Sequence, residues 1–454
     1  MPKNKKRPKK QTAAQRATAG LNKGKARALG LLRSAPGVLR EKGNALYRRA
    51  DVFIRFKGSA ALIAVAMLAL MLFTYSIQRY RYLFGNFPFY ATRMAQFYLI
   101  DYSVGFVSRA LVGHIISLFT DKVSFALIVR LTHTVLWISL ALQAGLAALA
   151  FKKAWLRKSP LLCWLFVLFA LSHHTVIPNV INFGVLDVYN LILAAVYVYL
   201  SDTRAGKWLV PLVCFTGIIL HYQFVLAYLT MILSVELYYI VKNKKGRALR
   251  TALFCLTVLG SGALAVYLVL FSKSHVKMDA AQLYDHMRSK YTDLQGFGLF
   301  EEYFTYYIYG DYQGVNYSNP ADFLKFLISY SLGKLNPLSH ILYALSAFPV
   351  FGLLGCLWVS MAKRAPKKER LPYYVFMLQP LTLAAAMVVS TDTSRWAGAC
   401  WFSCFMLLFT ALRNDGPALA EAAARATDKT WKKIAAAAVG LLSYACTVYI
   451  YASY

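Results

Sequence analysis

Long apolar runs recur along the chain, separated by short stretches rich in charged, glycine or proline residues. A helix of about 20 apolar residues can cross the hydrocarbon core of a bilayer, and such runs are typical of membrane-spanning helices. Eleven segments are candidate spans: 59–77, 125–150, 160–176, 185–201, 208–221, 222–241, 251–271, 338–361, 373–390, 397–412 and 432–452. The pattern therefore predicts an all-α, polytopic membrane protein with about 11 transmembrane helices.

The composition agrees with this prediction. The chain has 454 residues, of which 58% are hydrophobic and 15% are charged, whereas soluble globular chains average about 25% charged residues. This composition excludes a soluble enzyme, a disordered chain and a collagen-like chain. The sequence contains no GxxxxGK[ST], GxGxxG or HExxH pattern, so nucleotide-driven transport and zinc proteolysis have no support.

One apolar segment, 97–119, carries Asp101, Arg109 and His114 and therefore fits a span poorly. Basic residues gather on the cytoplasmic side of a membrane, and this rule tests the threading. If 97–119 does not cross, four basic loops fall on the same side as the N-terminus: 152–158, 242–250, 363–370 and 413–433. If it crosses, all four move to the other side. We therefore predict that 97–119 is a re-entrant or interfacial helix on the outer face and that the N-terminus is cytoplasmic.

Residues 1–57 form a basic tail with 17 Lys and Arg side chains against 2 Asp and Glu, within a net charge of +32. Such a tail can be an arm for nucleic acid, but this one runs straight into an apolar span. We therefore expect a cytoplasmic tail, amphipathic where it nears the membrane, that binds anionic lipid and no nucleic acid. Residues 58–454 then form the polytopic domain, with long outer loops at 78–124 and 272–337.

Ionisable side chains at membrane depth are costly, so each is a candidate functional residue. With the threading above, most of them gather near the outer surface: Asp101, Arg109, His114, His173, His174, Asp187, His221, Asp392 and Arg395. This convergence from distant stretches is the strongest functional signal in the sequence.

The stretch from Asp101 to Arg109 is the most informative one. On a helix, Asp101 shares a face with Gly105 and Ser108, and Arg109 lies at the edge of that face. A guanidinium can hold a phosphate while a carboxylate accepts a proton, so this combination favours a catalytic role. The alternative is a structural ion pair that allows a helix to lie at the interface.

The segment 173–187 forms an outer turn between two spans. Asn182 and Asp187 can hydrogen-bond sugar hydroxyls there, and His173 precedes them. The spacing matches no reliable metal-ligand pattern, which favours turn and interface residues over a metal site. The seven cysteines lie in apolar runs and indicate no disulfide framework.

Two further stretches extend the candidate site. His221 lies where two apolar runs meet, and it is either a turn residue or a polar tip that reaches the site. Asp392 and Arg395 are three residues apart and can pair locally on a helix. Helix capping by the aspartate and interfacial anchoring by the arginine are the structural alternatives.

Taken together, the layout resembles the GT-C glycosyltransferases of the bacterial envelope. In that superfamily a cytoplasmic N-terminus leads into one span, then a long outer loop with an acidic catalytic residue, then many spans and further outer loops. The matching elements are the span 59–77, the loop 78–124 with Asp101, and the loop 272–337. The pair Arg109 and Arg395 is also similar to the outer-loop arginines of O-antigen polymerases.

The resemblance implies a membrane glycosyltransferase at the outer face of a bacterial cytoplasmic membrane. Such an enzyme takes a sugar from a polyprenyl-phosphate donor and passes it to an envelope glycan or lipid acceptor. Asp101 is then the general base, and Arg109 and Arg395 bind the donor phosphate. The other candidates bind or orient substrate: His114, His173, Asn182, Asp187, His221 and Asp392.

Several alternatives stay open at this point. The same features fit an O-antigen-type polymerase, or a transporter or flippase of lipid-linked saccharide that has no enzyme site. A scaffold for other envelope enzymes is a third class. No cofactor is assigned, and a divalent metal stays an open alternative because some GT-C branches place a second acid beside the catalytic one.

Overall fold

The computed structural model describes most of the polytopic part of the chain. The described residues are 45–83, 95–176, 186–243, 246–271, 276–292, 337–389 and 393–452, with short pieces at 311–312, 315–316, 325 and 329. The chain divides into two units, Met1–Ser59 and Ala60–Tyr454. The first unit contributes the helix Ala45–Arg55, which carries exposed apolar side chains such as Leu46 alongside an exposed Asp51–Arg55 ion pair.

Six helices in the described residues are long and apolar enough to cross a membrane. They are α5 (Phe125–Leu156), η2 (Val225–Leu229) continued by α10 (Thr230–Lys242), α11 (Arg247–Val266), α15 (Pro337–Arg364), α18 (Thr393–Asn414) and α20 (Thr430–Ala452). The number rises to seven if α2 (Ser59–Leu83) is counted with the helix before it. The chain is therefore an all-α protein with several membrane-spanning helices.

The remaining helices are shorter. They are α4 (Leu111–Ser117), α6 (Pro160–Leu171), α8 (Asp187–Leu200), α9 (Gly206–Leu220), α12 (Ala280–Lys290), α16 (Leu371–Leu378), α17 (Leu381–Val389) and α19 (Gly416–Ala426), with the short helices η1 (Ala95–Tyr98), η3 (Tyr267–Phe271) and η7 (Lys367–Glu369). Strands β1 (Asp311–Tyr312) and β2 (Val315–Asn316) pair antiparallel. Each of the eleven segments expected to be spans overlaps a helix.

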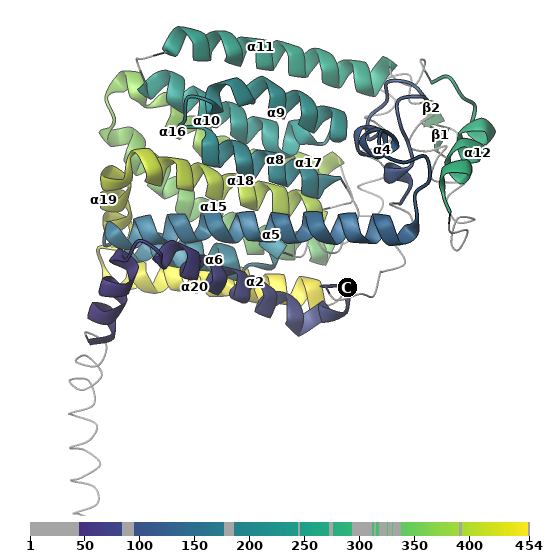
Figure 1. Cartoon of the computed structure of the whole chain (residues 1–454). Helices are drawn as coiled ribbons and strands as arrows, with labels where there is room; N and C mark the ends of the chain where they lie inside the picture. Colours follow the sequence, from purple (N-terminus) through teal and green to yellow (C-terminus); the bar gives the residue numbers. More distant parts are fainter. Residues whose placement is uncertain are drawn as a thin grey trace, which may run out of the picture. The chain divides into compact units, whose positions relative to one another are not determined.

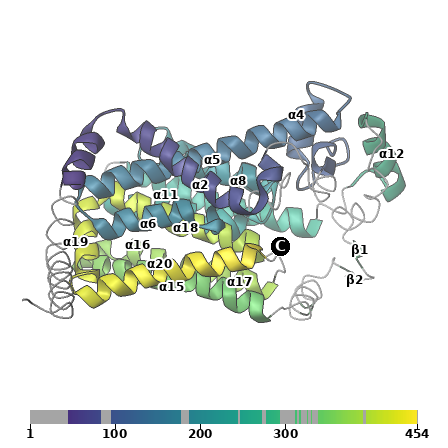
Figure 2. The ribbon, with the colours of Figure 1, turned by 90° about the horizontal axis from the view of Figure 1, so that it is seen from below.

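The long helices of the second unit run side by side (Figures 1 and 2), and α18 is the most deeply buried of them. Of its most apolar 18-residue window, 94% is buried, against 17% for α11. Helix α18 packs against α5, α10 and α15, and its Trp401 and Phe405 rings lie in contact, with centroids 4.9 Å apart. A helix that is apolar on all sides and buried on all sides forms the core around which the others pack.

The four basic loops named from the sequence lie at one end of this unit. Lys242, at the end of α10, forms ion pairs with Glu369 at 3.1 Å and Asp415 at 3.2 Å. Arg364, at the end of α15, bonds Glu421 of α19 at 3.0 Å. The Arg157 side chain lies beside Gly416. The helices α4 and α12 lie at the opposite end (Figure 1).

The helix expected over 97–119 is only partly present, and the expectation is wrong for residues 101–110. That stretch consists of turns between η1 and α4. The Asp101 carboxylate accepts a hydrogen bond from the backbone N–H of Ser103 at 2.9 Å, a local bond that competes with helix formation. Gly105 and Arg109 both adopt positive φ, at 136° and 74°. Asp101, Gly105 and Ser108 therefore share no helical face.

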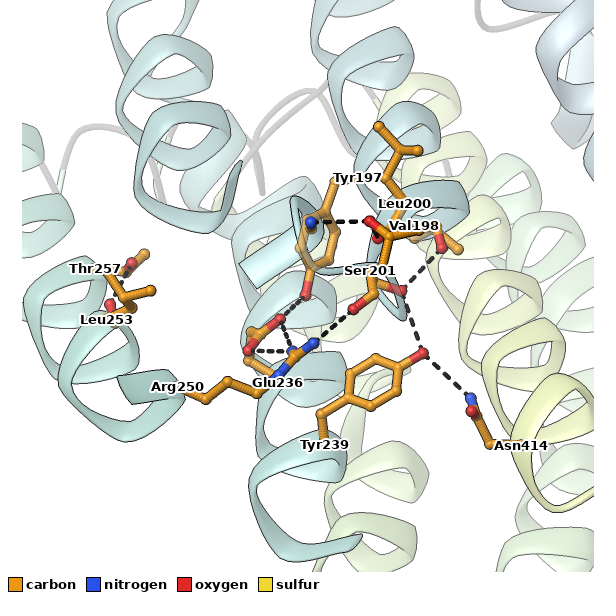
Figure 3. Close-up of polar contacts among 12 residues, drawn as sticks. Tyr197, Val198, Leu200, Ser201, Glu236, Tyr239, Arg250, Leu253, Thr257 and Asn414 are labelled. Atoms are coloured by element: carbon orange, nitrogen blue, oxygen red, sulfur yellow. Dashed lines mark hydrogen bonds and ion pairs between the residues drawn. The ribbon is translucent and has the colours of Figure 1, made fainter. Parts of the chain in front are cut away.

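A buried polar network links three helices at the basic end of the bundle (Figure 3). Arg250 of α11 bonds both carboxylate oxygens of Glu236 on α10, at 2.7 and 2.8 Å, and donates to the Ser201 carbonyl at 2.8 Å. The Tyr197 hydroxyl donates to the same carboxylate at 2.7 Å. The guanidinium also lies over the Tyr239 ring, 4.6 Å from its centroid. Three helices (α8, α10 and α11) are thereby tied by one ion pair.

We expect Glu236→Ala to lower the free energy of unfolding by about 3–5 kcal/mol, because it leaves the Arg250 guanidinium buried without its carboxylate. The fall in Tm of the detergent-solubilised chain measures the effect. The double change Glu236→Leu with Arg250→Met should recover most of the loss. As a control, Arg425→Ala removes an exposed partner of Glu421 and should change stability by less than about 1 kcal/mol. Equal Tm values for Glu236→Ala and Arg425→Ala would contradict this account.

Candidate functional site

Three polar stretches, far apart in sequence, meet at the turn between α9 and η2. Arg109 lies with its Nη2 atom 2.9 Å from Nε2 of His221. Arg395, on the first turn of α18, donates from Nη2 to the side-chain oxygen of Gln223 at 2.7 Å. Its Nε donates to Asp187, at the start of α8, at 2.6 Å. Two guanidinium groups therefore converge on one three-residue turn.

The local backbone explains why this turn can receive them. Helix α9 ends at Leu220, and His221 adopts an extended conformation with φ −163° and ψ 119°. The chain then turns directly into the π-helix η2. π-Helices are rare in proteins as a whole but common at functional sites. Arg109 is docked onto the same helix end, because its backbone N–H donates to the Ile219 carbonyl at 3.1 Å. Its positive φ of 74° is an uncommon state for a non-glycine residue and is typical of functional sites.

Arg109 is buried, with 7% of its surface exposed. Its guanidinium lies over two aromatic rings, 5.2 Å from the Phe97 centroid and 5.5 Å from the Tyr222 centroid. Arginine stays charged in proteins and can only donate hydrogen bonds, and the backbone N–H of Gln223 also lies 3.0 Å from Nδ1 of His221. A neutral imidazole accepts at only one of its two nitrogens, so the two donors compete for this ring. The two aromatic rings stabilise this buried cation through cation–π contacts.

A small cavity lies beside Arg395. It has a volume of about 30 Å³, and its lining includes Asp187, Asn190, Gln223 and Tyr228. The side-chain oxygen of Asn190 is buried and has no hydrogen-bond partner among the described atoms. A cavity of this size holds one or two water molecules and has no room for a sugar. The cavity must therefore widen before it can admit a substrate.

A second cluster surrounds Asp101, at the end of the second unit that holds α4 and α12. Its carboxylate accepts hydrogen bonds from the Lys290 ammonium and the Ser103 hydroxyl. His286 lies one helical turn before Lys290 on α12, with Nε2 3.2 Å from the Ser103 hydroxyl and 3.7 Å from Asp101. Asp101 and Arg109 therefore have different partners, which differs from the ion pair considered from their spacing.

Two features hold α12 against Asp101. The helix begins with a capping box, in which the Asp279 side chain accepts from Gln282 N–H and the Gln282 side chain accepts from Asp279 N–H. At its other end, Val123 N–H donates to the Lys290 carbonyl at 2.7 Å, and Thr292 N–H donates to the Val123 carbonyl at 3.1 Å. These bonds place the ammonium and the imidazole beside the carboxylate.

The protonation states in this cluster follow from its contacts. Burial alone raises the pKa of Asp101, but the hydrogen bonds from Lys290 and Ser103 outweigh it and lower the pKa to about 2. Burial and the nearby Lys290 charge lower the pKa of His286, so its ring is neutral at pH 7. Asp101 is therefore an ionised carboxylate and a weak base while Lys290 stays bound to it.

The other predicted residues lie in different surroundings. His114 packs against Tyr102, with ring centroids 4.8 Å apart. His173 and His174 are buried: His173 Nδ1 lies 3.5 Å from the Thr447 hydroxyl, and His174 Nε2 lies 2.7 Å from the Ser346 hydroxyl. His174 also borders the cavity beside Arg395. Asn182 and Asp392 lie outside the described residues.

The structure also adds residues that the sequence did not single out. Gln223 joins Arg395 to the central turn, and Lys290 with His286 completes the cluster around Asp101. Lys290 lies 189 positions after Asp101, so no local spacing connects the two. The sequence offers one signal for this contact: the loop 272–337 carries similar numbers of acidic and basic residues, whereas the four loops named above are basic.

The residues present do not favour a divalent metal. Among the described residues, no group of three His, Cys, Asp or Glu side chains is arranged to hold one. Around Asp101, the carboxylate oxygens already bond Lys290 and Ser103, and an ammonium repels a second cation. The chemistry of this cluster is therefore derived from its own side chains.

No protein-family model, curated protein or solved structure matches this chain. The functional argument therefore depends on the geometry of the two clusters.

The low pKa of Asp101 sets the pH range in which α12 is held. The folded-state pKa of about 2 lies below the value of about 3.9 for a free aspartate. The stabilisation is therefore complete above about pH 4 and is lost as the pH falls toward 2. We expect hydrogen exchange in residues 280–291, corrected for its intrinsic pH dependence, to accelerate over that range.

Lys290→Met should give fast exchange in residues 280–291 already at pH 7, because the ion pair is absent there. The matched control is Lys277→Met, a change to an exposed lysine ahead of the same helix, which should leave the exchange slow. Slow exchange in Lys290→Met at pH 7 would show that the ion pair does not hold α12.

Proposed function

We propose that the protein is a membrane glycosyltransferase that moves a sugar from a polyprenyl-phosphate-linked donor to an envelope glycan or lipid acceptor. The observation that carries the proposal is the convergence of Arg109 and Arg395 on the His221–Gln223 turn. Guanidinium groups recognise phosphate oxygens in a planar, bidentate manner. Two of them at one turn suit a lipid phosphate donor, and the ionised carboxylate of Asp101, eight residues before Arg109, is the candidate base.

The location of the charges supports an outer site. The four basic loops lie at one end of the second unit and the two arginines with Asp101 at the other. Basic loops favour the cytoplasmic side, so the proposed site faces away from the cytoplasm of a bacterial cell, with the N-terminal tail inside and bound to anionic lipid.

The proposed reaction is a displacement at the anomeric carbon of the donor sugar. The acceptor hydroxyl attacks that carbon while its proton passes to Asp101. The bond between the anomeric carbon and the phosphate oxygen breaks, and its electron pair leaves with the polyprenyl phosphate. Arg109 and Arg395 stabilise the negative charge that develops on this leaving group.

Two existing contacts must change for the reaction. The donor phosphate takes the place of Asp187 as the partner of Arg395, which also widens the cavity of about 30 Å³. The acceptor displaces Lys290 from Asp101, so the pKa of the carboxylate rises and it becomes a stronger base. His221 and Gln223 hold the two guanidinium groups in position throughout.

A second candidate is a transporter or flippase of lipid-linked saccharide. One expected span is interrupted, because α16 and α17 are separated at Gln379–Pro380. Broken helices are common in transporters. Cysteines placed at Ser172 and Asn190 discriminate the two functions, because alternating accessibility to labels from the two sides indicates transport, whereas constant protection indicates a fixed pocket. An O-antigen-type polymerase shares the first chemistry and differs only in its acceptor.

We expect Asp101→Asn to lower glycosyl transfer by about 10²–10⁴-fold, the usual effect of losing a general base. Arg395→Gln should lower it by about 10²–10³-fold, because one donor to the leaving phosphate is lost. The measurement is the analysis of lipid-linked sugars and surface glycans in host cells that lack the chain and are complemented with each variant. The donor should accumulate and one glycan decoration should disappear.

The control is Asp121→Asn, a change to an exposed aspartate on the same outer loop, which should restore the glycan fully. All three variants should insert in the membrane to the same level. Asp121→Asn should keep the Tm of the unmodified chain, whereas Asp101→Asn and Arg395→Gln each lose an ion pair and should unfold at a lower Tm. Full glycan synthesis by Asp101→Asn at normal abundance would remove Asp101 from the mechanism, and unchanged lipid-linked sugars in cells without the chain would overturn the proposed function.

A further inference from the structure

A large apolar groove lies on α15, well away from the arginine site. Its volume is about 740 Å³, and its walls come from α15 on one side and from α16, α17 and the break between them on the other. Ligand pockets commonly measure about 300–1,000 Å³. The groove is open on one side, so an occupant can enter from the surrounding bilayer.

Small residues on one face of α15 create this groove. Gly352, Cys356 and Ser360 recur every four residues and therefore lie on the same helical face. A Cβ atom added to Gly352 would meet nothing within 4 Å. The opposite wall contains Met377 and Leu381. The surface is therefore apolar and hollow along the helix.

One end of the groove carries positive charge. Lys363, in the last turn of α15, is exposed and lines the groove. Lys367 and Lys368 follow it, while the nearby acid Glu369 is bonded to Lys242. The 15 helical steps from Phe348 to Lys363 span about 22 Å at 1.5 Å per residue. A single leaflet contributes about 15 Å of hydrocarbon, so the groove is long enough to hold one acyl chain with its headgroup at Lys363.

We propose that this groove binds one anionic phospholipid, with an acyl chain along Gly352 and Cys356 and the phosphate at Lys363. The lipid belongs to the leaflet at the basic end of the bundle, so it is not the donor of the proposed reaction. It is a bound lipid that fills the groove between α15 and the α16–α17 break on the protein surface. The inference is independent of the proposed function.

A second copy of the chain is the other occupant to consider, because small residues spaced by four allow transmembrane helices to approach closely. Copies related by an axis normal to the membrane bring equivalent ends of α15 together. Lys363 and its lysine neighbours would then face their counterparts, and like charges repel. An anionic headgroup complements the same cluster, which favours the lipid.

The test is native mass spectrometry of the full chain in detergent, after exposure to dioleoyl phosphatidylglycerol or dioleoyl phosphatidylcholine. The unmodified chain should retain one phosphatidylglycerol in preference to phosphatidylcholine. Gly352→Leu fills the groove and should abolish this retained lipid. Lys363→Gln should lower the preference for phosphatidylglycerol about fivefold, as each cation near a membrane surface contributes about 1 kcal/mol.

The matched control is Gly262→Leu, a change to a helical glycine of α11 whose Cβ would also meet nothing within 4 Å. It should retain the lipid as the unmodified chain does, at an equal Tm. Lipid retention by Gly352→Leu that equals the control would overturn the proposal. Efficient Cys356–Cys356 cross-linking between two copies that carry Cys255→Ser would also overturn the proposal, because it would identify the groove as a contact between copies.

Discussion

A charge removed from water must keep a counter-charge or an equivalent partner, and this requirement organises both ends of the bundle. At the basic end, Arg250 pairs with Glu236, which also accepts a hydrogen bond from the Tyr197 hydroxyl. At the other end, Arg395 pairs with Asp187, and Arg109 lies between aromatic rings and a neutral imidazole. The helices can pack only in arrangements that bring these partners together, so the polar contacts select the helix neighbours that apolar surface alone would leave open.

The two ends differ in how completely their polar groups are satisfied. The carboxylate of Glu236 receives bonds from Arg250 and Tyr197 and borders no cavity among those found in the described residues. Beside Arg395, by contrast, there is a small cavity, and the buried amide oxygen of Asn190 has no hydrogen-bond partner among the described atoms. A closed network suits a structural role, whereas an incompletely satisfied one has capacity for a ligand. This contrast separates ionisable residues that stabilise from those that can bind, although both kinds look alike in the sequence.

The sequence predicted the positions of the helices because hydropathy depends on each segment by itself, and every expected span overlaps a helix. Of the eleven spans expected, six or seven of the described helices are long and apolar enough to cross a membrane. It failed at residues 101–110, where the bond from Asp101 to the Ser103 backbone and the positive φ of Gly105 favour turns over helix. The sequence could indicate that Arg109 and Arg395 belong near one another, since both were expected at the outer ends of spans. It could not supply Lys290 as the partner of Asp101, because that contact depends on how two segments 189 positions apart fold onto each other.

The carboxylate of Asp187 affects how tightly and for how long Arg395 can hold an anionic ligand. The guanidinium holds this internal anion when nothing else is bound, so an arriving anion replaces one partner with another and gains only the difference between them. The bound anion also leaves easily, because the Asp187 carboxylate pairs with Arg395 again as the anion dissociates. The guanidinium therefore has an anionic partner at every stage. A pocket whose arginine already pairs with an internal carboxylate binds an anionic ligand less tightly and releases it faster.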